Sequence, residues 1–197
     1  FAGEAIGTVC PSAPILVPIN LVTRAGGCID VDPDLNATIK DAAGKVFEAE
    51  VRDSVVFTCM NELAQGTWNS IENKPIKITT RPGKGIIIFD FAANLRTVRS
   101  KQSLPAEPEI SKCEVASPCG AFQTKGHLGP CDVTGIPTTC IQCSIAPELF
   151  PALNIPKAGG HIHFEQDNSY ILDAKGRKLL LEEHSGATHI DRAKARR

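Results

Sequence analysis

Aromatic residues and an excess of either charge are both scarce in this chain of 197 residues. It contains one Trp and one Tyr, and Phe, Trp and Tyr together make up 5% of the sequence. Few aromatic rings leave few platforms on which nucleic-acid bases could stack. The 21 Lys and Arg residues nearly balance the 22 Asp and Glu residues, which gives a formal net charge of −1. This balance argues against a nucleic-acid-binding protein, which normally carries a basic surface.

Long apolar runs and familiar catalytic motifs are also missing. No stretch reaches the roughly 18 consecutive apolar residues of a membrane-spanning helix, so no transmembrane segment is expected. The sequence has no Gly-x-Ser-x-Gly motif and no phosphate-binding Gly-x-x-x-x-Gly-Lys-Ser/Thr motif. Its single Cys-x-x-Cys motif, Cys140–Cys143, has no second copy at zinc-ribbon spacing. No catalytic residue is therefore predicted.

The residues that are present favour a mainly β fold. Short stretches that alternate in polarity or are rich in β-branched residues recur between turn signals, whereas helical periodicity is weak. We expect a disulfide-stapled, β-sandwich-like architecture of one or two small β domains with short helices. The predicted strands include Ile15–Thr23 and Gly160–Glu165, and the predicted short helices are Met60–Gln65, Pro147–Leu153 and His189–Arg196.

Two predicted hairpins share the same turn chemistry. Asp41 opens one turn and Asp173 opens the other, and each is followed three residues later by glycine, at Gly44 and Gly176. An Asp side chain can accept hydrogen bonds from the backbone of the turn, and glycine readily adopts positive φ. Strands are therefore expected on both sides of each turn. A third hairpin is predicted around the turn at residues 81–84.

A polar stretch with two prolines, residues 101–110, is the candidate linker. It would separate a β domain at residues 1–100 from a β domain at residues 111–197, which is richer in cysteine and ends in a basic segment. Three cysteines precede the linker and five follow it. If all eight are paired, at least one disulfide bond must join the two sides.

The cysteines also indicate a compartment. An even number spread along the chain favours disulfide bonds in an oxidising environment, each contributing about 2–4 kcal/mol to stability. Zinc ligation and reduced core cysteines are the weaker alternatives. We therefore expect a secreted, extracellular protein. The disulfide candidates are Cys10, Cys28, Cys59, Cys113, Cys119, Cys131, Cys140 and Cys143.

Two further features agree with secretion. Asn36 begins the only Asn-x-Ser/Thr sequence in the chain and is the candidate glycosylation site. Arg196 and Arg197 form a basic pair, the type of site after which furin- or kexin-type proteases cleave. A solvated basic helix end is the simpler interpretation of that pair, since cations favour a helix C-terminus.

His161 and His163 form the sharpest local motif. On a strand, alternate side chains share a face and lie about 7 Å apart, so this pair could offer two imidazoles to one metal ion. Glu165 would lie about 13 Å from His161, too far to join the same ion from a straight strand. A third ligand would come from His127, His184 or His189. A structural strand with half-exposed histidines is the favoured interpretation, and no cofactor is predicted apart from this candidate metal.

A cluster of carboxylates offers a second metal candidate. Asp30, Asp32 and Asp34 fall in one predicted loop, where they could hold Ca²⁺, although a solvated acidic loop is the favoured interpretation.

The leading functional hypothesis is a secreted, non-enzymatic protein that binds a protein partner or a cell-surface receptor. Pathogen effectors and adhesins, which act in virulence and host–pathogen interaction, and surface-glycoprotein ectodomains are proteins of this type. One alternative is a secreted metal-dependent enzyme that uses His161 and His163. Another is a precursor segment released by cleavage after Arg197.

Overall fold

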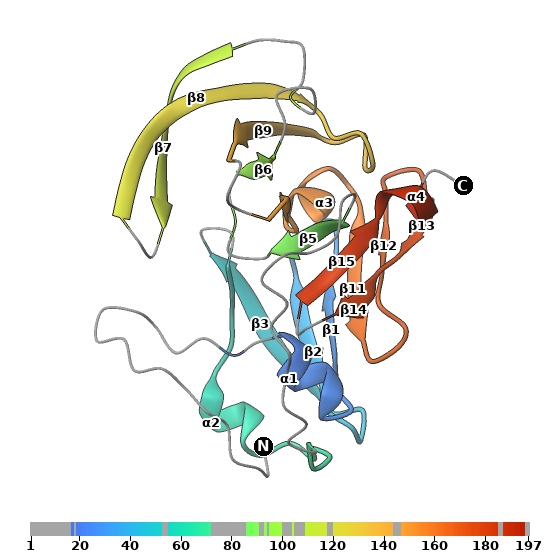
Figure 1. Ribbon diagram of the computed structural model, residues 1–197. Coiled ribbons are helices and arrows are strands. Elements are labelled where there is room, and N and C mark those ends of the chain that lie inside the picture. Colours follow the sequence, from blue (N-terminus) through green and yellow to red (C-terminus); the bar gives the residue numbers. More distant parts are fainter. Residues whose placement is uncertain are drawn as a thin grey trace.

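A computed structural model shows how the strands are arranged (Figure 1). It describes residues 17, 19–52, 55–71, 86–90, 93, 95–99, 104, 109–117, 120–143, 147–184 and 187–195. Within these ranges, the side chains of 109–117, 120–123, 184, 194 and 195 are not described. Three β-sheets contain the described strands, joined by short helices.

The largest sheet has seven strands, and every neighbouring pair in it is antiparallel. Strands from both ends of the chain meet at its centre, where β1 lies beside β11. In spatial order the sheet contains β13 (Lys178–Leu180), β12 (Tyr170–Leu172), β11 (His161–Glu165), β1 (Cys28–Val31), β2 (Ala37–Lys40), β3 (Val46–Arg52) and β4 (Val55–Phe57).

The two smaller sheets each have four strands and one parallel pair. The first contains β10 (Leu149–Pro151), β5 (Ile86–Asp90), β15 (Ala187–Asp191) and β14 (Glu182–His184). The second contains β6 (Arg96–Val98), β9 (Pro137–Gln142), β8 (Gly120–Pro130) and β7 (Glu109–Ser117). The strands β7 and β8 form a long curved hairpin at the top of Figure 1.

The described helices are short: α1 (Ile19–Arg24), α2 (Met60–Leu63), α3 (Asn154–Lys157) and α4 (Arg192–Ala195). The prediction of a mainly β protein with short helices is confirmed. The prediction of a strand over Ile15–Thr23 is wrong, because α1 occupies the described residues 19–23 of that stretch and buries Val22 and Thr23. The prediction of a helix over Pro147–Leu153 is also wrong, because β10 forms there. Among the described residues, none of the helices has the length and apolar character needed to cross a membrane.

One apolar core joins elements from both sides of the candidate linker. Ile29 and Phe47 on the N-terminal side belong to the same buried cluster as Phe150, Ile162 and Phe164 on the C-terminal side. Most of the linker candidate 101–110 lies outside the described residues. The division into two domains and the sandwich-like packing stay predictions, and the described strands of the two sides share a sheet and a core.

The two Asp-x-x-Gly turns adopt the predicted geometry. Gly44 and Gly176 have φ values of 83° and 77°, and the flanking strands pair as hairpins. Asp41 also accepts a hydrogen bond from the backbone nitrogen of Thr67 at 2.6 Å, so it joins its turn to a segment 26 residues away. The first strand of the third predicted hairpin, 76–80, and its turn lie outside the described residues.

The predicted disulfide staples find no support among the described cysteines. Five cysteine side chains are described, and each is a free thiol: Cys28, Cys59, Cys131, Cys140 and Cys143. The sulfurs of Cys28, Cys131 and Cys140 contact oxygen atoms of Asp30, Asp132 and Thr138 instead of another sulfur. The side chains of Cys10, Cys113 and Cys119 lie outside the described residues. In the described part of the chain, strand pairing and the apolar core hold the fold together.

Buried charge joins the smaller sheets. The Arg96 side chain on β6 is 2% exposed and donates to Asp132 Oδ1 at 2.6 Å. Arg192 of α4 lies 3.2 Å from the other oxygen of Asp132 and also binds Glu148. Removing one partner from this network of ion pairs would leave a buried charge without compensation, which is strongly destabilising.

We expect Asp41→Asn to lower the melting temperature more than Asp173→Asn, because only Asp41 also binds Thr67. Hydrogen bonds from backbone N–H groups, that of Thr67 foremost, hold the pKa of Asp41 below its usual 3.8. A lowered folded-state pKa gives stability that is fully present above the ordinary value and is lost as the pH falls below it. Thermal unfolding monitored by circular dichroism should therefore show that the difference in melting temperature between Asp41→Asn and the unchanged protein becomes smaller in acid. Equal losses in the two variants at neutral pH would contradict this expectation.

Candidate functional site

The candidate site lies on the polar face of the seven-stranded sheet. Alternate residues of a strand point to opposite faces. On β1, Ile29 and Val31 enter the core, so Cys28 and Asp30 share the other face. On β11, the buried residues are Ile162 and Phe164. The residues that alternate with them, His161, His163 and Glu165, therefore lie on the same polar face as Cys28 and Asp30.

The register between β1 and β11 brings these side chains together. Asp30 lies opposite His163, and Cys28 lies opposite Glu165. A glycine is required immediately before β11, because a Cβ atom at Gly160 would collide with the carbonyl oxygen of Leu172 on β12. The Gly-Gly pair before the histidines thus allows β11 to run close to β12 and hold its register.

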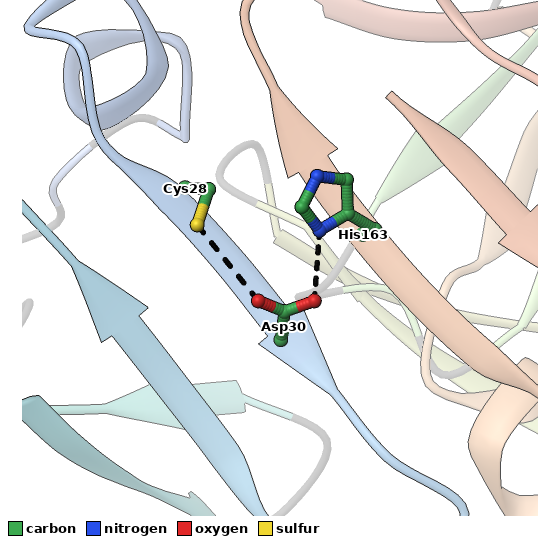
Figure 2. A group of neighbouring side chains, drawn as sticks. All are labelled: Cys28, Asp30 and His163. Carbon is green, nitrogen blue, oxygen red and sulfur yellow. Dashed lines mark hydrogen bonds and ion pairs between the residues drawn. The ribbon is translucent and has the colours of Figure 1, made fainter. Parts of the chain in front are cut away.

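Asp30 is the centre of the site. Figure 2 shows its carboxylate between Cys28 on the same strand and His163 on the neighbouring strand. The Nδ1 of His163 lies 2.8 Å from Oδ1, and the Nε2 of His161 lies 3.2 Å from the same oxygen. On the other oxygen, Lys40 Nζ is 3.6 Å away and Cys28 Sγ is 3.8 Å away. One half-buried carboxylate therefore binds four side chains from three strands.

Three of these groups lie at metal-binding distances. One ligand atom from each of Cys28, Asp30 and His163 lies within 4.8 Å of the other two. In a tetrahedral zinc site, with bonds of about 2.0–2.3 Å, ligand atoms are separated by roughly 3.3–3.6 Å. Side-chain movements of about 1 Å would therefore bring the three atoms around one ion.

A second layer of contacts orients His163. Its Nε2 faces Glu165 Oε2 at 3.4 Å, and Asn168 Nδ2 donates to that same oxygen at 2.8 Å. The imidazole stacks on the ring of Tyr170, with ring centroids 4.9 Å apart. Lys178 Nζ lies 3.9 Å from the Tyr170 ring centroid. The ring of His163 is thus held at both nitrogens and on one face.

The electrostatic environment favours charged carboxylates and a neutral thiol. Burial acts to raise the pKa of Asp30, but the hydrogen bond and charge of His163, with Lys40, lower it overall. The hydrogen bonds from Asn168 and His163 lower the pKa of Glu165. Burial, followed by the charge of Asp30, raises the pKa of the Cys28 thiol.

The grouping of Cys, His and Asp does not fit a cysteine nucleophile. A nucleophilic cysteine needs a lowered pKa and a base within reach. Burial raises the pKa of Cys28 instead. The two ring nitrogens of His163 both face carboxylates, at Asp30 and Glu165, so neither is directed at the sulfur. Metal ligation uses the same three groups without requiring a free thiolate beforehand, because the ion itself displaces the proton.

The structure places His161 and His163 on one face, as the strand spacing predicts, and puts Asp30 between them. The third ligands considered from the sequence lie elsewhere: His127 is on β8, and His189 is buried on β15 near Glu182. The side chain of His184 lies outside the described residues. Sequence reasoning missed Cys28 as a partner. The alternation of polar and apolar residues at 28–31 was the available signal, but it could not indicate which strand lies alongside.

The carboxylates of Asp30 and Asp32, which the sequence placed in one loop, have different structural roles. Asp30 belongs to β1, whereas Asp32 accepts hydrogen bonds from the backbone nitrogens of Asp34 and Asn36 and so closes a turn. The three carboxylates therefore do not share one loop, as the Ca²⁺ candidate considered from the sequence would require. Asn36 is exposed in that turn, and its glycosylation stays a prediction. Arg196 and Arg197 lie outside the described residues.

No family model matches this chain, and no curated protein or solved structure matches it either. Its function must therefore be inferred from the geometry of its own residues.

Asp30→Ala should destabilise the metal-free protein by about 1–3 kcal/mol, because it leaves Lys40 and two imidazoles without their shared acceptor. Urea unfolding in the presence of a chelator measures this loss. The exposed Asp34 provides a matched control, and Asp34→Ala should change stability by less than about 0.5 kcal/mol. If the two variants unfold at the same urea concentration, Asp30 does not hold this face together.

Proposed function

We propose that this protein binds a divalent transition-metal ion of the Zn²⁺ type through Cys28, Asp30 and His163. The observation that carries this proposal is the convergence of a thiol, a carboxylate and an imidazole within 4.8 Å. Thiolate and imidazole ligands favour zinc and related ions, whereas Ca²⁺ and Mg²⁺ favour sites made of oxygen atoms alone. The chemistry of the three groups therefore selects the class of metal.

The hydrogen bond between His163 and Asp30 supports the same proposal. A metal ion would take the place of the proton between Nδ1 and Oδ1, which are 2.8 Å apart. Opening this gap to a metal-bridged separation needs only a small rotation of either side chain. The Cys28 sulfur, 3.8 Å from Asp30, would release its proton to solvent on binding the ion and would complete a set of three ligands.

The surrounding contacts resemble the outer shell of a metal site. Metal-bound histidines almost always donate their second ring N–H to a carboxylate, a carbonyl or water. Glu165 stands at that position beside His163 Nε2, and Asn168 fixes its carboxylate. The Nε2 of His161 contacts Oδ1 of Asp30, so His161 would orient this carboxylate as a ligand. We therefore assign His161 and Glu165 to positioning the ligands.

His163 thus keeps the role considered for it in the sequence, but its partners change. The metal-dependent alternative paired His161 with His163, whereas Cys28 and Asp30 now supply the other two ligands in this proposal. The hypothesis of a secreted binding protein rested largely on disulfide bonds, for which the described cysteines give no support. Secretion, a protein partner and processing after Arg197 stay predictions.

The test is to add zinc to the purified, chelator-treated protein and to measure its binding by calorimetry and by thermal unfolding. An ion that binds only the folded state stabilises it by about 2.7 kcal/mol at a hundredfold excess over Kd. Cys28→Ser and His163→Ala should abolish this stabilisation. His127→Ala is the matched control, because His127 lies on a different sheet, and it should bind zinc as the unchanged protein does.

Two further variants separate ligands from positioning residues. His161→Ala and Glu165→Gln should each weaken zinc binding about 10- to 100-fold without abolishing it. Zinc binding that persists unchanged in both Cys28→Ser and His163→Ala would refute the proposal.

A further inference from the structure

We propose that the metal ion bound at this site keeps one coordination position open to solvent, and that this position takes a carboxylate ligand paired with Lys40. This inference rests on the proposed metal site and names the class of molecule that the loaded site would bind.

The open position follows from the direction of the three ligands. Cys28 and Asp30 come from β1 and His163 from β11, and all three side chains rise from the same face of one sheet. These three residues would therefore hold an ion from the side of the sheet, on the face opposite to the apolar core. Zinc sites with three protein ligands complete their tetrahedron with water or another exogenous ligand.

Among the residues that the structure describes, the two polar neighbours of the ligands, His161 and Glu165, do not fill that position as they stand. His161 is turned to Asp30 Oδ1, and it is not part of the group whose ligand atoms lie within 4.8 Å of one another. Glu165 is engaged by Asn168 and His163. Both side chains therefore contact ligand residues, and within the described part of the chain the fourth position is left to a molecule from solution.

Lys40 gives the open position a preference for anions. It lies opposite Cys28 on β2, and its Nζ is 3.6 Å from Asp30 Oδ2 with the side chain 45% exposed. When Asp30 ligates the ion, its charge is shared with the metal and Lys40 loses much of its ion-pair partner. An incoming carboxylate could then bind the ion with one oxygen and Lys40 with the other, and both contacts are charge-assisted.

The experiment uses the full-length protein loaded with Co²⁺, whose visible absorption reports its ligands and geometry. Acetate is the probe, added at constant ionic strength against perchlorate, which coordinates metals poorly. The spectrum should change saturably with acetate. Lys40→Met should weaken acetate binding about two- to fivefold, which corresponds to the loss of one exposed ion pair. Lys40→Arg, which keeps the charge, should retain most of the affinity.

Lys175→Met provides the matched control, because Lys175 is an exposed lysine of the turn after β12. It should respond to acetate as the unchanged protein does. If the cobalt spectrum does not change when acetate is added, this inference is wrong and the proposed metal site is unaffected. Acetate binding that appears only in His161→Ala also overturns it, because His161 would then be the fourth ligand. If no cobalt spectrum forms at all, the proposed metal site itself is wrong.

Discussion

The register between β1 and β11 is the constraint on which the rest of this structure depends. It places Asp30 opposite His163, although 133 residues separate them in the sequence. Because strand side chains alternate between faces, slipping either strand by one residue would exchange its two faces. Such a slip on β1 would turn Asp30 into the core and expose Ile29 and Val31. The apolar core therefore enforces the register that assembles the polar site on the other face.

The polar groups on this face are partners of one another. Asp30 lies among Lys40, His161, His163 and the Cys28 thiol, so a half-buried carboxylate is not left without partners. The same arrangement holds three proposed metal ligands close together before any ion binds. Folding already brings the ligands from two distant segments to one point, so the conformational entropy of ordering them is not lost again when the ion binds. More of the binding free energy therefore contributes to affinity.

Local chemistry was largely readable from the sequence, and long-range pairing was not. The two Asp-x-x-Gly turns were predictable because Asp41, Asp173 and the glycines after them act within five residues. The shared face of His161 and His163 followed from strand periodicity alone. Cys28 was instead grouped with the other cysteines, because an even cysteine count suggests disulfide bonds. Nothing local to residues 28–31 indicates that β11 lies beside them. The apolar residues of Ile15–Thr23 predicted a strand, but the helix Ile19–Arg24 forms there.

The proposed role of Cys28 changes what the eight cysteines can mean. A cysteine that ligates a metal cannot also form a disulfide bond, and the other four described cysteines, Cys59, Cys131, Cys140 and Cys143, are free thiols as well. The three cysteines whose side chains are not described, Cys10, Cys113 and Cys119, are an odd number and cannot all pair with one another. Of the described free thiols, Cys140 is fully buried, and burial raises the pKa of its thiol, which makes it unreactive. The even count therefore loses its force as evidence for a fully oxidised protein once one cysteine has a different chemical task.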